Sequence, residues 1–238
     1  MRLMFLFLVA LSIGPHSYAE EPPTAGKVIA ATIRYHDPND RWFSSANRLV
    51  IEQTRPGGHS VKQVTFTLFP AKERFRIAFA QDGYEVSGEF DGTDCSTDPT
   101  TLSEEEKGRF RDFDCDQVRW LHRYYGYLFN APMNLRDEGG SVDPAVVPES
   151  FEGQDAHRVT IRYGDDQPVW EYFIDTTTQA LLGCRFSSGG KREDGELIVY
   201  DGEVESDGVR LPKKRSWYLH ADGTLIGIDT IVEIRQET

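Results

Sequence analysis

Apolar and polar side chains alternate along most of the chain. In the first half the alternation runs through residues 49–52, 64–68, 74–79 and 84–90, and a hairpin signal, Asp82-Gly83, separates the last two segments. A period of two residues is typical of β-strands, because successive side chains point to opposite faces of a sheet. Since polar positions recur throughout, we expect one buried face and one wet face, as in antiparallel sheets.

The second half shows the same alternation as a run of hairpins. We expect strands within residues 157–163, 169–175, 180–186, 197–199, 209–219 and 226–234. The last is the most regular, with Ile226, Ile228, Thr230, Val232 and Ile234 in alternation. Between the halves we expect a charged connection at residues 95–116 and a Gly-, Asp- and Pro-rich loop at 137–148. Ser103 and Glu106 form a capping box, which predicts a helix start in the first connection.

Residues 118–130 break the alternation and predict a long helix. One apolar face follows the helical period and consists of Val118, Leu121, Tyr125 and Leu128. A second apolar flank lies beside it and consists of Trp120, Tyr124 and Tyr127. An ordinary surface helix is apolar over only about a third of its circumference. We therefore expect the sheet to cover the first face, and loops or a ligand to cover the second.

A shorter helix is predicted near the start of the chain. It opens after Pro22-Pro23-Thr24, and its apolar period runs through residues 28–35. The turn-rich run at residues 36–40 ends it. Together the patterns predict a mostly β fold with α elements, of the α+β class. We expect one strongly curved antiparallel sheet, or unclosed β-barrel, with helices packed on its concave face.

The first 19 residues have the organisation of a signal peptide. Arg2 supplies the charge, residues 3–13 form an apolar run too short to span a bilayer comfortably, and Ser17-Tyr18-Ala19 has the pattern of a cleavage site. The alternative is an N-terminal membrane anchor, but no second half of a span follows. We predict a cleaved signal peptide at 1–19, no lipoprotein anchor, a single β-rich domain at 20–238, and a periplasmic or secreted location without stable membrane insertion.

The chain is strongly acidic, with a formal net charge of -13. Such a chain is repelled by phosphate backbones and by anionic membrane surfaces, which argues against nucleic acid as a partner. We interpret the acidity as a means of solubility in preference to a cation-binding role. The sequence indicates no cofactor.

Three cysteines are present, and export makes disulfides available to them. Cys95 and Cys115 both lie in polar, Asp-rich surroundings and bracket the segment before the long helix, so we predict a disulfide between them. Cys184 alternates with apolar neighbours, which predicts a buried free thiol.

Polar candidates for chemistry are sparse. His36-Asp37 has the residue types of an acid–base or metal pair, but a histidine at a helix end followed by Asp-Pro also makes a structural corner. The histidines lack the spacing of zinc ligands, and the serines lack a nucleophile elbow. We therefore predict neither catalytic nor metal-binding residues. Lys213-Lys214-Arg215 is interpreted as a charged strand exterior that discourages edge pairing, and alternatively as a docking patch.

An aromatic set is the most informative group of side chains. We predict that the ligand-binding residues are Trp120, Tyr124, Tyr127, Met133, Trp170 and Trp217. Flat apolar walls with a few hydroxyl groups suit an acyl chain or another apolar ligand. The alternative is that these side chains are simply core.

Four motifs carry a family resemblance. They are residues 33–38 (Ile-Arg-Tyr-His-Asp-Pro) with Trp42, residues 124–137 (Tyr-x-x-Tyr-Leu-x-x-x-Pro-Met-x-Leu-x-Asp), residues 171–175 (Glu-Tyr-Phe-Ile-Asp) and residues 212–218 (Pro-Lys-Lys-Arg-Ser-Trp-Tyr). Over nearly the whole mature chain, they resemble a family of exported bacterial proteins of unknown function. The rhythm of strand, Ile-Asp, short Thr turn and strand also resembles the periplasmic lipoprotein carriers of the LolA and LolB type. That resemblance implies an unclosed barrel with helices across its mouth that shelters acyl chains, and it implies no catalytic residues.

Three functional hypotheses follow. The first is an exported, non-enzymatic binding protein for a lipid, an acyl chain or another apolar ligand. The second is an enzyme that uses His36 and Asp37, which would then have to line a common pocket. The third is a structural or interaction module of the cell envelope.

Overall fold

The computed structural model describes residues 23–58, 61–98, 113–136, 139–164, 167–187 and 195–237. The predicted signal peptide at 1–19 and the capping box of Ser103 and Glu106 lie outside these residues. The described helices are α1 (Ala25–His36) and α3 (Cys115–Asn130), with short 3-10 turns η1 (Trp42–Ser44), η2 (Pro70–Lys72) and η3 (Met133–Arg136). Within the described ranges, no helix is long and apolar enough to cross a membrane.

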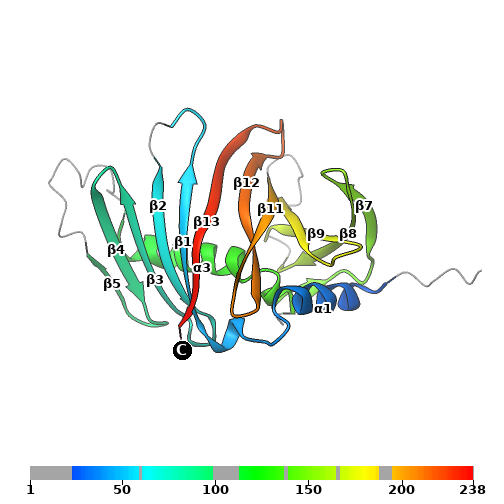
Figure 1. Ribbon diagram of the computed structural model, residues 1–238, viewed down its shortest axis with the longest axis horizontal. Helices are drawn as coiled ribbons and strands as arrows, with labels where there is room; N and C mark the ends of the chain where they lie inside the picture. The colour runs from blue at the N-terminus through cyan, green and yellow to red at the C-terminus, as the bar shows by residue number, and fades with distance from the viewer. Residues whose placement is uncertain are drawn as a thin grey trace, which may run out of the picture.

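Two meanders of strands make up a single antiparallel sheet (Figure 1). The first contains β1 (Ala46–Thr54), β2 (Lys62–Phe69), β3 (Arg74–Gln81), β4 (Tyr84–Phe90) and β5 (Cys95–Asp98). The second contains β6 (Ser141–Val142), β7 (Val147–Phe151), β8 (Gln154–Arg162), β9 (Val169–Asp175), β10 (Leu181–Ser187), β11 (Glu196–Ser206), β12 (Val209–Leu219) and β13 (Leu225–Glu237). Pairing of β1 with β13 joins the two meanders, and β5 and β6 lie at opposite ends of the strand order.

The sheet curves around α3, which runs behind it from β4 towards β11 in Figure 1. This arrangement confirms the expected unclosed, mostly β fold with a helix across one face. Close approach begins at Gly88 on β4, where a Cβ atom would lie 2.4 Å from Cγ2 of Val118. A larger residue at position 88 would therefore require the Val118 side chain, at the start of α3, to move away.

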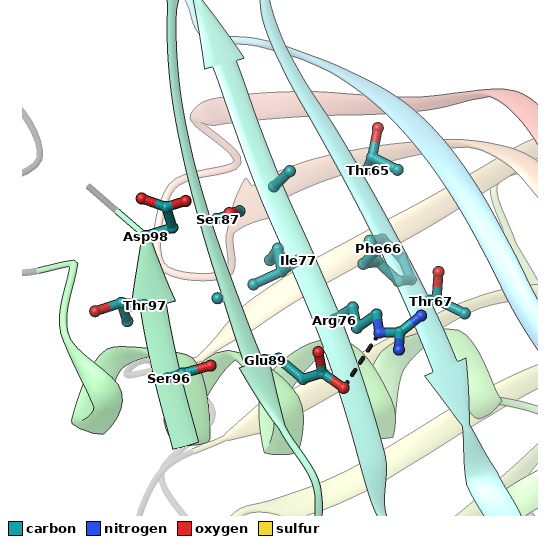
Figure 2. Close-up of a pocket in the computed structure, with 12 residues that line it drawn as sticks. Thr65, Phe66, Thr67, Arg76, Ile77, Ser87, Glu89, Ser96, Thr97 and Asp98 are labelled. Atoms are coloured by element: carbon teal, nitrogen blue, oxygen red, sulfur yellow. Dashed lines mark ion pairs between the residues drawn. The ribbon is translucent and has the colours of Figure 1, made fainter. Parts of the chain in front are cut away.

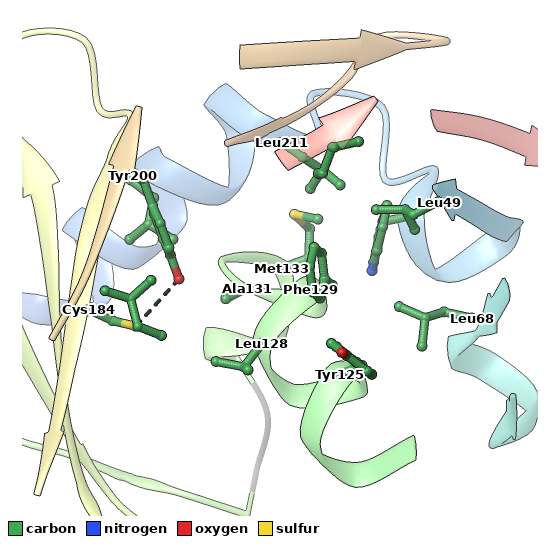
Figure 3. Close-up of a cluster of buried hydrophobic side chains, with 14 of the residues drawn as sticks. Leu49, Leu68, Tyr125, Leu128, Phe129, Ala131, Met133, Cys184, Tyr200 and Leu211 are labelled. Carbon is green, nitrogen blue, oxygen red and sulfur yellow. Dashed lines mark hydrogen bonds between the residues drawn. The ribbon is translucent and has the colours of Figure 1, made fainter. Parts of the chain in front are cut away.

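Buried side chains fill the space between α3 and the first meander, where Figure 3 shows Tyr125 and Phe129 of the helix with Leu49 and Leu68 of the strands. Phe66 on β2 stacks on Tyr125, with ring centres 5.1 Å apart, and meets Phe129 edge-on at 4.9 Å. Leu121, Tyr125 and Leu128 are all buried, as the helical period predicts. The apolar face of α3 is therefore true core.

The Cys95–Cys115 disulfide is confirmed, with Cα atoms 5.7 Å apart. It joins the outermost strand of the first meander to the first residue of α3. Cys184 is confirmed as a buried free thiol on β10.

The predicted corner after α1 is confirmed as a structural feature. Trp42 is fully buried, and its indole Nε1 donates to Oδ1 of Asn130 at the end of α3 (2.7 Å). Asp37 accepts from the backbone N–H groups of Arg41 and Trp42 (2.8 and 2.9 Å). These bonds fix the end of α1 to the end of α3.

Three short strands were not expected. Residues 95–98 form β5, and β6 and β7 lie within or beside the segment interpreted as a loop. Their sequences are polar and short, so they show no apolar alternation. Neighbouring strands recruit them: β4 pairs with β5, and β8 pairs with both β6 and β7.

The expected alternation in β13 is wrong for part of the strand. A bulge places Val50 opposite Glu233 and Ile51 opposite Ile231, so Val232 is skipped and is 48% exposed. A bulge exchanges the two faces of the strand beyond it. Consequently Ile231 and Asp229 turn inward.

The interpretation of Lys213-Lys214-Arg215 as an exterior edge is also wrong for Arg215. Strand β12 lies between β11 and β13, and only 1% of Arg215 is exposed. Its guanidinium carbon lies 3.9 Å from the centre of the Phe129 ring, and its Nη1 donates to the carbonyl of Pro212 (2.9 Å). Burial lowers the pKa of this guanidinium. The aromatic face of Phe129 stabilises the buried cation.

Candidate functional site

A groove of about 510 Å³ lies between α3 and the second meander, and we call it the aromatic groove. Its helix wall consists of Trp120, Arg123, Tyr124, Tyr127 and Leu128. Its facing wall consists of Tyr163, Gln167, Pro168, Trp170 and Phe186. Ligand pockets typically occupy about 300–1,000 Å³ and are predominantly apolar and aromatic. The groove therefore has the size and lining of a small-molecule site.

The helix wall contains the second apolar flank that the sequence predicted, together with Arg123 and with Leu128 of the first face. Trp120 and Tyr124 are one turn apart, and their rings stack with centres 4.7 Å apart. Trp120 is 46% exposed, so it forms the rim of the groove. Exposure of so large an apolar ring costs solvation free energy unless something covers it.

The facing wall follows from strand register. Trp170 on β9 lies opposite Phe186 on β10 and Ile161 on β8, so their side chains share the inner face of the sheet. The ring centres of Trp170 and Phe186 are 4.5 Å apart, and those of Trp170 and Tyr127 are 4.6 Å apart. Trp170 thus connects the two walls.

A chain of three tyrosine hydroxyl groups runs beneath the groove. The Tyr172 hydroxyl donates to that of Tyr127 (2.7 Å), which donates in turn to that of Tyr163 (3.0 Å). Burial raises the pKa of both Tyr172 and Tyr127, so these hydroxyl groups stay neutral. The paired hydroxyl groups let the aromatic walls remain otherwise apolar.

Four of the six predicted ligand residues line the aromatic groove: Trp120, Tyr124, Tyr127 and Trp170. Trp217 is 5% exposed and lies behind Tyr124, with ring centres 6.0 Å apart; its Nε1 donates to Asp229 (3.1 Å). Met133 is fully buried in the core beside Phe129 (Figure 3). Trp217 and Met133 are therefore core residues and do not line the aromatic groove.

Sequence reasoning missed Tyr163, Phe186 and Arg123. The strand period predicted at 157–163 already places Tyr163 on one face with Ile161, and Phe186 extends the alternation of Cys184 in the same way, but neither was assigned to the ligand site. Arg123 lies three residues after Trp120 and four before Tyr127, on the same side of the helix. Its charge concealed its position.

A second hollow lies on the opposite face of the sheet and has a different character (Figure 2). It spans β2 to β5, has a volume of about 370 Å³, and presents hydroxyl side chains such as Thr65, Ser87 and Ser96. Within it, Arg76 and Glu89 form an ion pair (3.2 Å). Arg76 and Glu89 thus satisfy each other, and Asp98, the other charged residue of the lining, is also not free, so this polar surface offers a ligand little that is unpaired.

His36 and Asp37 do not form a common site. His36 is 1% exposed; its Nδ1 donates to the Arg210 carbonyl (2.7 Å), and its Nε2 accepts from the Leu181 N–H (3.0 Å). Burial lowers its pKa, in keeping with a neutral ring. Asp37 lines a separate hollow of about 480 Å³ beside α1, which His36 does not reach. The geometry required by the enzyme hypothesis is therefore not met at this corner.

Other reactive groups are few among the residues that the structure describes. No cluster of three or more His, Cys, Asp or Glu side chains there could hold a metal ion. Burial raises the pKa of the Cys184 thiol to about 12, so it is a poor nucleophile at neutral pH.

Comparison with known proteins defines the relationships of the chain. A family described as "Family of unknown function (DUF6503)" matches residues 2–234. No curated protein matches the sequence. Among solved structures, a LolA superfamily protein from Nitrosomonas europaea superposes with a TM-score of 0.56 at 9% identity, covering 91% of this chain and 95% of that one. A DUF1329 family protein from Desulfovibrio piger gives a TM-score of 0.45 at 8% identity, over 90% and 93% of the two chains. The first likeness confirms the LolA-like fold.

Proposed function

The chain belongs to the DUF6503 family of unknown function, and we propose that it is an exported, non-enzymatic binding protein that holds an apolar ligand in the aromatic groove. An acyl chain or a similar hydrocarbon is the expected ligand class. The observation that carries the proposal is a groove of about 510 Å³ with aromatic walls and an exposed tryptophan at its rim.

The chemistry of the groove favours binding over catalysis. The Tyr127 and Tyr163 hydroxyl groups are hydrogen-bonded to each other, and burial raises the pKa of Tyr124 and Tyr127, so both of these stay neutral. Such walls give apolar area and shape but no obvious nucleophile or general base. Burial of a hydrocarbon chain there would be favourable by roughly 25 cal/mol for each Å² of apolar surface removed from water.

The fold and the covalent chemistry support an extracytoplasmic carrier. The chain resembles a LolA superfamily protein in fold, and carriers of that type are expected to shelter acyl chains. The Cys95–Cys115 disulfide fits an oxidising compartment, and the first 19 residues have a signal pattern. We accordingly propose a periplasmic or secreted location.

Two measurements test the proposal. Protein purified from an exporting host without detergent should release apolar molecules into organic solvent, detectable by mass spectrometry. Delipidated protein should bind N-phenyl-1-naphthylamine, a neutral fluorescent probe, in a saturable manner. Tyr127→Ala should weaken this binding because it removes part of the helix wall and the central member of the chain of tyrosine hydroxyl groups.

Tyr35→Ala is the matched control. Tyr35 lies on α1, outside the groove, and its hydroxyl donates to Glu203 (2.8 Å). It should leave probe binding unchanged. The absence of both a co-purifying apolar molecule and saturable probe binding would overturn the proposal.

A further inference from the structure

One charged side chain lies in the aromatic groove. Among the described residues that line it, Arg123 is the only one with a formal charge. It is exposed, on the same side of α3 as Trp120 and Tyr127. Its guanidinium is therefore available at the rim while the apolar walls lie beside it.

Arg123 also differs from Arg119 and Arg136, two arginines of this acidic chain that pair with carboxylates. Arg119, one turn earlier on α3, pairs with Asp116 (3.4 Å), and Arg136 pairs with Asp40 (3.1 Å). Within the part of the chain that the structure describes, Arg123 has no carboxylate partner. Among the described residues, Arg123 therefore combines a place in the lining of an apolar groove with the lack of an ion pair to a carboxylate.

We propose that the ligand of the aromatic groove is a single-chain amphiphile with a carboxylate head group, such as a long-chain fatty acid. The carboxylate pairs with the Arg123 guanidinium at the rim, and the hydrocarbon chain lies along the aromatic walls. This inference rests on the proposed function and adds the chemical class of the ligand.

Charge and geometry favour this class. A guanidinium presents parallel N–H donors that match the two oxygens of a carboxylate. One cation balances the single charge of a carboxylate, whereas a phosphate monoester carries about −1.5 to −2. The overall acidity of the protein acts weakly at this contact, because salt screens charges beyond roughly 8 Å at physiological ionic strength.

The test compares two ligands that differ only in the head group. Dodecanoate and dodecan-1-ol compete at pH 8 for the groove of delipidated protein loaded with N-phenyl-1-naphthylamine. We expect the wild-type protein to bind the acid about tenfold more tightly than the alcohol, since a partly exposed ionic hydrogen bond contributes about that factor. Added salt should weaken the binding of dodecanoate but not that of dodecan-1-ol, because salt screens the ion pair.

Arg123→Gln should abolish the preference by weakening dodecanoate binding about tenfold relative to dodecan-1-ol binding in the same variant. Arg119→Gln is the control, because Arg119 is on the same helix but does not line the groove. It should behave as the wild type does. Thermal unfolding of both variants verifies that they are folded.

The outcomes separate this inference from the proposed function. Equal binding of acid and alcohol by the wild type, or an unchanged preference in Arg123→Gln, would overturn the assignment of the head group and leave the groove as a binding site. Saturable probe binding that neither ligand displaces would overturn the single-chain class. Failure of the probe itself to bind would remove the proposed function as well.

Discussion

The two flanks of α3 meet the same sheet in opposite ways. On the first flank, Tyr125 and Phe129 are 4% and 0% exposed and pack directly on Phe66 of β2. On the second flank, Trp120 is 46% exposed, and the aromatic groove, with a volume of about 510 Å³, lies between the helix and the second meander. Both flanks are aromatic, so composition does not explain the difference. What differs is that Phe66 encloses the rings of the first flank, whereas the aromatic groove lies beside those of the second.

Polar groups follow the same division. We call the first flank, packed on β2, the filled flank, and the second, which borders the aromatic groove, the open flank. On the filled flank, Gln53 donates to the Tyr125 hydroxyl (3.0 Å) and to Asp229 (3.1 Å), whose pKa is raised by burial. On the open flank, the Tyr127 hydroxyl bonds only with those of Tyr172 and Tyr163 among the contacts described. Core packing and an internal polar network hold the filled flank, whereas the open flank borders the aromatic groove.

The largest expected effect comes from breaking the filled flank. Phe129→Ala removes a fully buried ring and the aromatic face beneath Arg215. We expect a loss of about 3–5 kcal/mol in the free energy of unfolding, measured by urea denaturation. A loss below about 1 kcal/mol would mean that this flank is not the packed core described above.

The disulfide tests whether the filled flank also needs a covalent tie. Replacing Cys95 and Cys115 together by Ala opens a loop with a sequence separation of 20 residues. The chain-entropy argument predicts a destabilisation of about 3 kcal/mol. Denaturation of the double variant beside the wild type under non-reducing conditions measures it, and Cys184→Ala is the control for loss of a thiol. Equal stability of the double variant and the wild type would contradict the prediction.

A pH titration of stability tests how His36 attaches α1 to strands of the second meander. His36 links α1 to β10 and β12 through its two ring nitrogens. Burial lowers its pKa below the usual value of about 6.5. The unfolded chain therefore takes up the proton first, so the stability from His36 is present above about pH 6.5 and is lost as the pH falls.

His36→Ala should cost about 1–3 kcal/mol at pH 7 for each buried backbone group left without a partner. The difference between wild type and variant should shrink from pH 7 to pH 5, as measured by denaturation at each pH. A difference that stays constant over this range would show that His36 does not titrate as described. Metal content should be the same in both proteins.

The smallest expected change in stability belongs to the rim of the open flank. Trp120→Ala removes a half-exposed ring whose described aromatic contact is the stack on Tyr124. We expect a loss of about 0.5–1.5 kcal/mol in stability. Binding of an apolar probe should nevertheless weaken on the order of tenfold. Equal losses in stability for Trp120→Ala and Phe129→Ala would erase the distinction between the flanks.

Periodicity predicted much of this fold. The expected strand at 169–175 matches β9. Trp120, Tyr124 and Tyr127 line the groove and Leu121 and Tyr125 are core, but Leu128 belongs to both, against the predicted division of the two flanks. These features depend on local alternation, which a sequence displays directly. The polar strand β5 and the skipped Val232 depend instead on pairing partners that are distant along the chain. Local patterns carry no information about such partners.

The candidate site was predictable to a similar extent. Apolar rings at helical or strand spacing located Trp120, Tyr124, Tyr127 and Trp170. Arg215 and Met133 show the limit: a cation was expected outside but stacks on a buried ring, and a methionine expected in the groove fills the core. The side that a residue occupies depends on strand order and on the curvature of the sheet.

The four tryptophans give each flank its own spectroscopic reporter. Trp42 and Trp217 are buried and donate hydrogen bonds to Asn130 and Asp229, so their emission should change chiefly when the molecule unfolds. Trp120 and Trp170 line the aromatic groove, where a bound hydrocarbon would replace water around their rings. Intrinsic fluorescence can therefore follow two processes without an external label. A change at Trp120 and Trp170 reports ligand entry into the folded protein, and a change at Trp42 and Trp217 reports unfolding.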